Sequence, residues 1–433
     1  MSELVMKYQQ YAEYKDSGVE WLGEIPKNWE VVRLKYIAEL SGNKVSGSEN
    51  QYVGLENVES KTGKFKVTEG IVSEGVSNTF EKDNLLFGKL RPYLAKSWLA
   101  SFSGICSSEF LVLNSQLVHP KFLKYMTLTD EFVEQVNSST YGSKMPRASW
   151  DFIGLLQLPV MDYGVSETIA NFLDHETAQI DTLIEKQQTL IQLLKEKRQA
   201  VISHAVTKGL NPDAPMKDSG VEWLGEVPEH WVIMQFRRIT SLSQGLQIPQ
   251  SERIHEPSKD NVEYITIKSI HAGDTLEHRE YINKPSLRVQ CDYDDVLLAR
   301  TGATGEVVTG VKGAFHNNFF KIDYSEKITK DFLVNMLKVQ ELKSHLLMLA
   351  GTTTIPDLNH GAFLSTAIAL PNLNEQEEIC LEISRLSEKY NLLLEVANKQ
   401  VKLLRERRTA LISAAVTGKI DVRGWRAADN KAS

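Results

Sequence analysis

Side chains that donate and accept several hydrogen bonds gather in three polar segments of each half of the chain. In the first half these are SGNKVSG (41–47), GKLRPYLAK (88–96) and STYGSKMPRAS (139–149). In the second half they are SQGLQIPQSER (243–253), ARTGATGE (299–306) and AGTTTIPDLNHG (350–361). Arg and Lys can donate to guanine, and Asn and Gln can pair bidentately with adenine. Other Lys, Ser and Thr can contact phosphates. The segments have the composition that DNA readout requires, although any one of them could equally be an ordinary polar connection.

The polar residues of these six segments are our candidate DNA contacts. In the first half they are Asn43, Lys44, Lys89, Arg91, Tyr93, Lys96, Ser143, Lys144 and Arg147. In the second half they are Gln244, Gln247, Arg300, Thr301, Thr304, Thr353, Asn359 and His360. Three segments recur in both halves at corresponding places but differ in their side chains, as expected for two copies of one binding domain with different targets.

Motifs for catalysis are not found. The sequence has no phosphate-binding G-x-x-x-x-G-K-[ST] loop, no G-x-G-x-x-G after a strand and no H-E-x-x-H. TGATGE (301–306) is predicted to be a turn between strands, and HNN (316–318) a polar loop. DYDD (292–295) is predicted to be a solvated turn. His255, His271 and His278 are expected at the surface. We therefore assign no catalytic residue and no metal ligand.

Length and composition indicate an ordinary globular protein. The 433 residues suffice for about two to four domains. The net charge of −7 argues against a simple basic nucleic-acid binder, but binding depends on where the basic residues lie. No apolar run approaches the length of a membrane helix, so no membrane contact is expected. Three distant cysteines suggest neither disulfides nor zinc, which favours a reducing cytoplasm.

An internal repeat runs through the chain. KDSGVEWLGEIPKNW (15–29) and KDSGVEWLGEVPEHW (217–231) differ at three positions of fifteen. LLKEKRQAVISHAVT (193–207) corresponds to LLRERRTALISAAVT (403–417). Each half therefore has an entry segment (15–29 or 217–231), a variable middle and an exit helix. We expect the paired Trp and the Pro of each entry segment to close the domain onto a helix end, although a role in partner binding is the alternative.

The middles are predicted to be mixed α/β. Short β-branched or aromatic runs such as VVRLKYI (31–37), NLLFGKL (84–90) and DVLLAR (295–300) predict strands. Residues 120–136 and 329–349 have apolar side chains at helical spacing, and each is expected to form a helix.

The exit helices have a seven-residue apolar repeat, which is typical of a coiled-coil seam. In the first, the main column is Leu173, Ile180, Gln187, Leu194 and Val201, flanked by Leu183 and Leu190. In the second, it is Ile383, Tyr390, Ala397, Leu404 and Leu411, flanked by Leu386, Leu393 and Gln400. We expect the two helices to pair with each other, and Gln187 and Gln400 to form a buried polar layer that sets their register. Two amphipathic helices on separate cores are the alternative.

Several segments resemble the specificity subunit of type I restriction–modification systems. They are the entry segments, LLFGKLRPYL, GICSSEF, GSKMPRASWDFIG, IANFLDHETAQIDTLI and LLRERRTALISAAVTGKID. The resemblance covers essentially the whole chain. It implies two target-recognition domains, an antiparallel coiled coil between them, and no catalytic activity of the chain itself. It also implies a double-stranded DNA target, each domain reading one half of it and the helices setting the gap.

The resemblance further implies that the chain carries no cofactor and works with catalytic partners. Two modification subunits would bind S-adenosylmethionine and methylate adenine, and restriction subunits would use ATP and Mg²⁺. In this interpretation Lys89, Arg91, Lys144 and Arg147 serve one half-site, and Arg300, Thr301, Thr304 and Asn359 the other. One departure concerns the family's Pro-x-Leu-x-Glu-Gln-x-x-Ile pattern. The second half has it in PNLNEQEEI (371–379), whereas the first has PVMDYGVSETI (159–169), which leaves the start of the first helix unspecified.

The expected fold is therefore α/β (α+β) with a pseudo-two-fold internal repeat. We place target-recognition domain 1 at 1–165, the first helix at 166–210, domain 2 at 211–375, the second helix at 376–420 and a tail at 421–433. Two alternatives remain. One is a specificity subunit that serves a methyltransferase without a cognate nuclease, and the other is a free-standing nuclease that would use DYDD (292–295) to bind metal.

Overall fold

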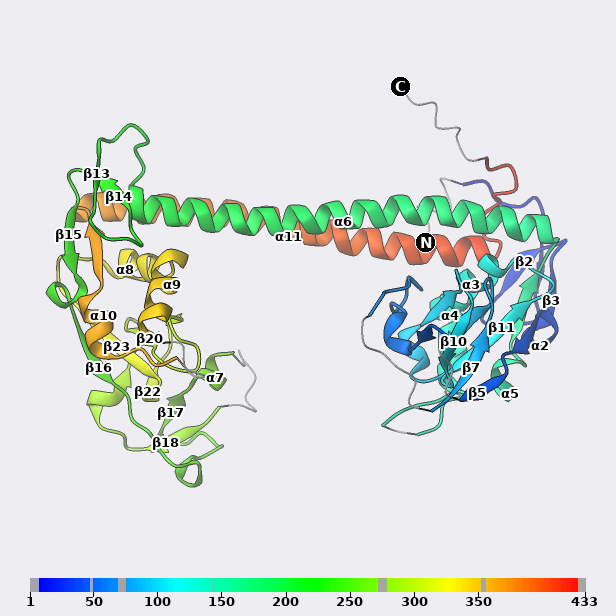
Figure 1. Cartoon of the computed structure of the whole chain (residues 1–433), viewed down its shortest axis with the longest axis horizontal. Helices are drawn as coiled ribbons and strands as arrows, with labels where there is room; N and C mark the ends of the chain where they lie inside the picture. The colour runs from blue at the N-terminus through cyan, green and yellow to red at the C-terminus, as the bar shows by residue number, and fades with distance from the viewer. Residues whose placement is uncertain are drawn as a thin grey trace. The chain divides into compact units, whose positions relative to one another are not determined.

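The computed structural model describes residues 8–46, 50–68, 75–142, 144–271, 279–351 and 356–426. The chain divides into two compact units (Figure 1). The first unit is Met1–Thr189 with Ala397–Ser433, and the second is Leu190–Val396. Each unit combines a body of strands and short helices with part of two long helices, α6 (Tyr163–Lys208) and α11 (Leu373–Val416). The mixed α/β class predicted from the sequence is confirmed.

Four small sheets form the strand framework of the first unit. They are β1–β2, β12–β3, β5–β7–β10–β6 and β4–β11–β8–β9. The bounds are β1 Tyr14–Asp16, β2 Glu24–Pro26, β3 Glu30–Arg33, β4 Ala38–Ser41, β5 Lys44–Ser46, β6 Tyr52–Val53, β7 Val76–Phe80, β8 Leu85–Gly88, β9 Ser97–Leu99, β10 Gly104–Ser107, β11 Phe110–Ser115 and β12 Gln157–Val160.

The described residues of the second unit also form two two-stranded and two four-stranded sheets. They are β13–β14, β15–β24, β18–β17–β22–β19 and β16–β23–β20–β21. The bounds are β13 Met216–Asp218, β14 Glu226–Pro228, β15 Val232–Gln235, β16 Thr240–Gln244, β17 Asn261–Ile265, β18 Tyr281–Asn283, β19 Gln290–Cys291, β20 Val296–Ala299, β21 Val307–Val308, β22 Gly313–Phe315, β23 Phe319–Tyr324 and β24 Ala367–Leu370. β4–β11–β8–β9 and β16–β23–β20–β21 are antiparallel throughout and occupy equivalent places in the two halves. The sequence repeat is therefore also a repeat of sheets.

Each helical stretch of the middles is broken into two helices, which corrects the expectation of one. The first gives α3 (Pro120–Thr127) and α4 (Asp130–Ser138). The second gives α8 (Lys330–Leu337) and α9 (Gln340–Leu349). The first break lies at Thr129, whose backbone is extended and whose hydroxyl accepts from Phe132 N. An N-cap threonine satisfies a free N–H of a new helix, so local hydrogen bonding overrides the apolar period. The remaining short helices are α2 (Leu34–Ile37), α5 (Trp150–Ile153), α7 (Ile267–His271) and α10 (His360–Ser365).

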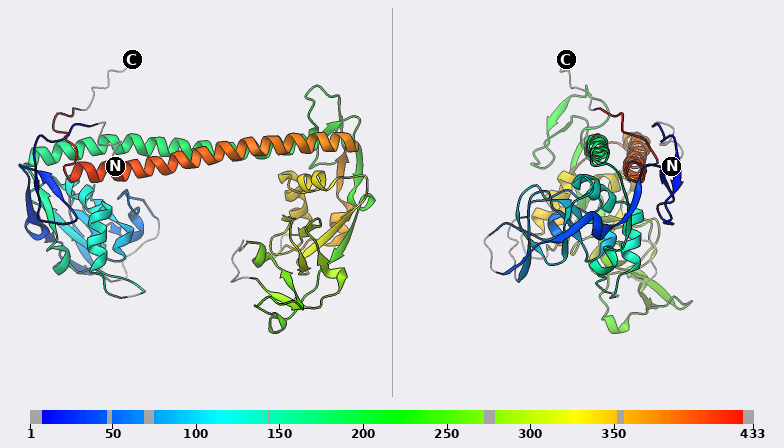
Figure 2. Two further views of the ribbon diagram at one scale, coloured as in Figure 1. Left: turned by 180° about the vertical axis from the view of Figure 1, so that it is seen from behind. Right: turned by 90° about the vertical axis from the view of Figure 1, so that its right-hand side faces the viewer.

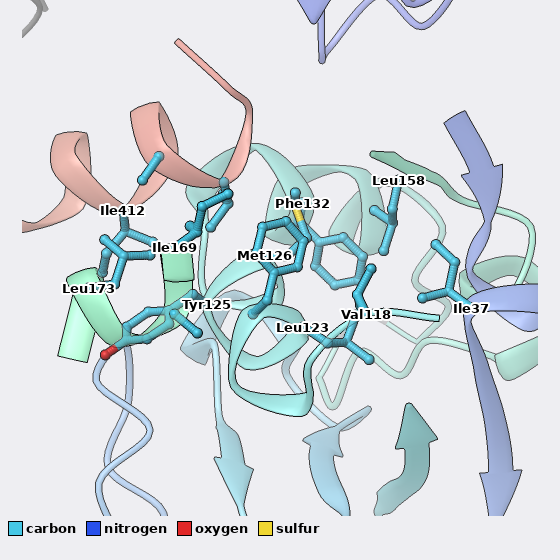
Figure 3. Close-up of a cluster of buried hydrophobic side chains, with 14 of the residues drawn as sticks. Ile37, Val118, Leu123, Tyr125, Met126, Phe132, Leu158, Ile169, Leu173 and Ile412 are labelled. Carbon is cyan, nitrogen blue, oxygen red and sulfur yellow. The ribbon is translucent and has the colours of Figure 1, made fainter. Parts of the chain in front are cut away.

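The core of the first unit joins its body to both long helices. Figure 3 shows Met126 and Phe132 of the body facing Ile169 and Leu173 of α6 and Ile412 of α11. All five are at most 3% exposed. Burial of one such side chain stabilises the fold by about 1.5–3 kcal/mol. The body therefore does not pack on a single helix but on the pair.

Within each unit α6 and α11 run antiparallel in contact. In the first unit Arg408 Nε donates to Asp181 Oδ1 at 2.9 Å. In the second, Arg198 Nη1 donates to Asn391 Oδ1, also at 2.9 Å. Both residues of each pair correspond through the repeat, because Asp181 matches Asn391 and Arg198 matches Arg408 at an offset of 210. The helix pairing predicted from the heptads is confirmed in both units.

The seam between the helices uses a different flank of the main column from the one we expected. Leu183, Leu190 and Leu393 are exposed, whereas the residues one position later are half-buried. The flanking columns are Ile184, Ile191, Arg198 and Ala205 on α6 and Ser387, Leu394, Val401 and Arg408 on α11. Both flanks carry apolar residues, so the sequence period alone allows either choice.

The expected glutamine layer is corrected by the same shift. Gln400 is exposed and Gln187 is half-buried. Val401, which follows Gln400 in the sequence, is buried in its place. Among the described residues the polar contacts across the seam are instead the two arginine bonds above. The expected polar layer of the two glutamines is therefore wrong, and the polar pairs between the helices are made by Arg198 and Arg408.

The start of α6 resolves the departure from the family pattern. In the second unit Gln376 Oε1 accepts from Thr329 N at 2.8 Å, which anchors α11 to the cap of α8. In the first unit Ser166 Oγ accepts from His119 N, the equivalent position before α3, at 2.9 Å. A serine thus makes the same acceptor contact as the family glutamine, and α6 begins at Tyr163.

The entry segments pack at helix ends, as predicted from their Trp and Pro residues. Trp29 and Trp231 are buried. Lys208, at the end of α6, donates to the carbonyls of Leu224 and Glu226 of the second entry segment. Lys419, just after α11, donates in the same way to Leu22 and Glu24 of the first entry segment. Each entry segment is therefore held by the exit helix of the other half of the sequence.

The two ends of the described chain meet in the first unit (Figure 2). Asp421 N donates to Gln9 O at 2.7 Å, and the Arg423 guanidinium lies over the Tyr11 ring. Trp425 packs against Phe172 of α6. The α6 helix is joined to the second entry segment by the chain itself. The α11 helix is joined to the first entry segment by these contacts between the two ends.

Candidate DNA interface

Two of the three polar segments of the first unit form one surface. Arg91 N donates to Pro146 O at 2.8 Å and Ala148 N donates to Lys89 O at 3.0 Å. These bonds join segment 88–96 to segment 139–149. The third segment is tied to the same sheets, because Lys44 pairs with Asn78 across β5 and β7 and Asn78 Nδ2 donates to Phe110 O. Ser143 and residue 47 lie outside the described residues.

The candidate side chains of this surface differ in whether they are available to a ligand. Arg147 makes two hydrogen bonds to the Glu109 carboxylate at 3.0 and 3.2 Å. Lys96 Nζ donates to Leu55 O, and burial lowers the pKa of Lys96. Within the described ranges no side-chain partner is found for the others, which are Asn43, Lys44, Lys89, Arg91, Tyr93 and Lys144. Arg91 is exposed at the left-handed φ of 50°, which projects it from the tip of its turn.

The segments of the second unit are likewise brought together. Leu358 N donates to Arg300 O at 2.9 Å, and Thr304 Oγ1 donates to Pro356 O at 2.9 Å. These bonds join segment 299–306 to segment 350–361. TGATGE (301–306) connects β20 to β21, as predicted. Thr353 lies outside the described residues, and Gln244 is exposed at the end of β16.

Arg300 is the centre of a stacked arrangement. Its Nη2 donates to Asp357 Oδ2 at 2.7 Å, and its guanidinium lies 5.3 Å from the Phe320 ring centre. The His360 ring packs on the same phenylalanine at 4.4 Å, and burial, followed by the Arg300 charge, lowers the pKa of His360. Arg300 Nε is buried and has no hydrogen-bond partner among the described residues. Asp357 therefore orients the Arg300 guanidinium. At least one donor of that guanidinium, Nε, stays unused within the described ranges.

Two other candidates have their polar groups used inside the fold. Thr304 is buried, and its hydroxyl contacts Arg300 O and Pro356 O. Asn359 Oδ1 caps α10 by accepting from Ala362 N at 2.9 Å. The Thr304 hydroxyl and the Asn359 carbonyl are therefore used inside the fold, whereas no partner is found among the described residues for the amide N–H groups of the exposed Asn359. Thr301 is half-buried beside them.

The acidic run DYDD is a charged turn. Asp292 contacts Lys312, Asp294 contacts Lys330 and Asp295 lies 3.7 Å from Lys321. The Tyr293 backbone N–H, followed by Lys312, lowers the pKa of Asp292. No group of three or more metal-ligating side chains occurs in the described ranges. Each aspartate of this turn thus lies near a lysine, as expected for a solvated turn.

Comparison with known proteins agrees with this geometry. Residues 228–403 match the family described as "Type I restriction modification DNA specificity domain". The "Type I restriction enzyme MjaVIII specificity subunit" of Methanocaldococcus jannaschii is 24% identical over 429 residues, covering 92% of this chain and 94% of the relative. Within the described ranges every helix is too short or too polar to span a lipid bilayer.

Two solved structures share the fold. A chain described under "Structural basis underlying complex assembly and conformational transition of the type I R-M system" has a TM-score of 0.68 at 17% identity, covering 90% of this chain and 98% of that one. The HsdS subunit from Thermoanaerobacter tengcongensis has a TM-score of 0.52 at 17% identity, with coverages of 92% and 98%. Residues 228–403 thus match the type I restriction–modification DNA specificity domain, and over most of its length the chain is similar to specificity subunits of such systems and shares the fold of two solved structures.

Proposed function

We propose that this chain is the non-catalytic subunit that reads a bipartite, asymmetric DNA target, each unit reading one half-site. The observation that carries the proposal is the recurrence of one surface with different side chains. In the first unit the available groups centre on Arg91 and Lys144, and in the second on Arg300 and Gln247. Cationic and amide donors on short, backbone-bonded loops suit base edges and phosphates.

We further propose that the long helices bind two modification subunits. Support comes from apolar side chains left uncovered at repeat-related positions. Leu183 and Leu403 are exposed in the first unit, and Leu193 and Leu393 in the second. Leu183 corresponds to Leu393 and Leu193 to Leu403 at an offset of 210. Exposed apolar patches mark protein interaction sites, and a repeated patch suits two copies of one partner. S-adenosylmethionine, and the ATP and Mg²⁺ of any restriction subunit, would be bound by the partners.

The decisive experiment is methylome sequencing of a host that lacks other methyltransferases and expresses this chain with its modification subunit. We expect adenine methylation in a motif with two short specified halves and a fixed unspecified gap. Replacing residues 211–375 by the same region of another specificity subunit should change one half only. Methylation without sequence preference, or a change in both halves, would contradict the proposal. A stand-alone methyltransferase would give the same methylome, so co-purification of a restriction subunit separates that alternative.

Arg91 provides a residue-level prediction for the first unit. Arg91→Ala should weaken binding of the selected DNA by about 1–3 kcal/mol and relax one position if the guanidinium contacts a base. If it contacts phosphate, all sequences should weaken alike and the salt dependence should fall. Fluorescence anisotropy at several salt concentrations measures both effects. Lys27→Ala, which removes an exposed charge from the entry segment, is the matched control and should leave binding within error. Equal affinities for Arg91→Ala and Lys27→Ala would contradict the assignment.

A further inference from the structure

The turn 316–318 lies at the meeting point of two polar segments of the second unit. Asn317 N donates to Leu246 O at 3.0 Å, within segment 243–253. Arg300 N donates to Asn318 O at 2.7 Å, within segment 299–306. From the sequence, this turn is predicted to be an ordinary polar loop. The structure instead holds it inside the candidate DNA interface by backbone hydrogen bonds on both sides.

Asn317 and Gln247 form an amide pair on this surface. Asn317 Nδ2 donates to Gln247 Oε1 at 3.1 Å. Each amide side chain has two N–H donors and one carbonyl acceptor. This single bond therefore leaves the Asn317 carbonyl and both Gln247 N–H groups without another hydrogen bond among the described residues. Gln247 is exposed and Asn317 is half-exposed, so these groups are accessible.

The backbone beneath the pair is firmly held. His316 Nδ1 accepts from Asn318 N at 3.0 Å, which closes the turn. The fully buried Tyr264 donates its hydroxyl to Leu246 O at 2.8 Å, and its ring packs against His316. The pair is therefore preorganised, which reduces the entropy lost on binding.

The unused groups match one base pair of the major groove. Adenine presents the N7 acceptor beside the N6 amino donor. The hydrogen-bonded pair carries both kinds of group, an N–H donor on Gln247 and a carbonyl acceptor on Asn317. Thr304 is less suited because its hydroxyl is used internally, and one nitrogen of the Arg300 guanidinium is already paired with Asp357.

We propose that Asn317 and Gln247 jointly read an A·T base pair in the half-site of the second unit. Gln247 Nε2 donates to adenine N7, and Asn317 Oδ1 accepts from N6. The inference rests on the proposed function, in that it names specificity-determining residues of the same surface. Neither side chain is charged, so a base contact by this pair adds sequence preference with little change in the salt dependence of binding.

The test is selection of random duplexes by the full chain co-purified with its modification subunits, followed by affinity measurement. Asn317→Ala should lower affinity for the selected site about 5- to 150-fold and abolish preference at one A·T position of one half-site. Gln247→Glu should shift that position toward C·G, because a carboxylate accepts from cytosine N4. Gln340→Ala, on the exposed face of α9, is the amide control and should select the wild-type sites.

The outcomes separate this inference from the proposed function. Wild-type selection of two half-sites with unchanged profiles for Asn317→Ala and Gln247→Glu would overturn the inference and leave the function standing. Uniform weakening of every duplex by Asn317→Ala would also overturn it, because that is the behaviour of a structural or phosphate contact. A wild-type complex that selects no sequence would overturn the proposed function and this assignment with it.

Discussion

Asp181→Leu should destabilise the first unit by about 3–5 kcal/mol, the usual cost of leaving one charge of a buried ion pair without its partner. Asp181 accepts from Arg408 Nε at 2.9 Å, and the two side chains are only 14% and 10% exposed. Lys64 of the body contacts the same carboxylate at 2.9 Å. One carboxylate thus holds α6, α11 and the loop that carries Lys64. Its removal frees the loop and leaves the buried Arg408 without its carboxylate partner.

The repeat supplies matched controls for this prediction. Asp181→Asn recreates the second unit's Arg198–Asn391 bond and should cost about 1–2 kcal/mol, because a hydrogen bond remains. Arg408→Met leaves Asp181 paired with Lys64 and should cost less than Asp181→Leu. Asn391→Leu removes an exposed hydrogen bond from a charged guanidinium to a neutral amide and, because water can replace it, should cost at most about 1 kcal/mol. Denaturant unfolding, with hydrogen exchange of residues 59–68, measures these differences. Equal costs for Asp181→Leu and Asn391→Leu would contradict the assignment.

Gly418→Ala should cost about 2–5 kcal/mol, whereas Gly209→Ala should cost about 1 kcal/mol. Both glycines follow an exit helix and have a left-handed φ, 72° at Gly418 and 80° at Gly209. Alanine at such a φ costs about 1–2 kcal/mol. A Cβ at Gly418 would also lie 2.5 Å from Pro26 Cγ and 3.1 Å from Trp29. Overpacking of this kind adds about 1–3 kcal/mol, since neither ring can move freely.

Comparing Gly418→Ala with Gly209→Ala tests whether the first entry segment is packed more tightly than the second. A Cβ at Gly209 would meet Glu375 and Trp231 at 3.5 Å, which is ordinary contact. Hydrogen exchange of residues 15–29 and 217–231 reports each segment separately, and thermal unfolding reports the overall cost. We expect Gly418→Ala to expose the first segment and Gly209→Ala to leave the second protected. Similar protection and similar melting temperatures for the two variants would show that the clash is relieved by movement of Pro26.

Local sequence determined the elements whose signal repeats or is periodic. The near-identical entry segments, the heptads of the exit helices and short apolar runs were sufficient for the repeat, the paired helices and strands such as β8 and β20. These features are encoded by hydrophobic burial at a regular spacing, which is visible along the chain. The run VVRLKYI (31–37), predicted to be a strand, is instead β3 followed by helix α2 from Leu34. The sequence also placed three polar segments at equivalent places in each half, but not their grouping into one surface, which depends on backbone hydrogen bonds between distant residues.

Tertiary structure alone decided which flank of each helix is buried and which polar groups stay free. Leucines stand on both flanks of the main column, so only the position of the partner helix selects Ile184 over Leu183 and Val401 over Gln400. Arg147 and Thr304 have the right chemistry for DNA but are occupied by Glu109 and Pro356, both distant in sequence. Asn317 was missed for the opposite reason, because its turn reaches the interface only through bonds to Leu246 and Arg300. Whether a donor faces a ligand or its own fold depends on contacts between residues far apart in the chain, which no local pattern records.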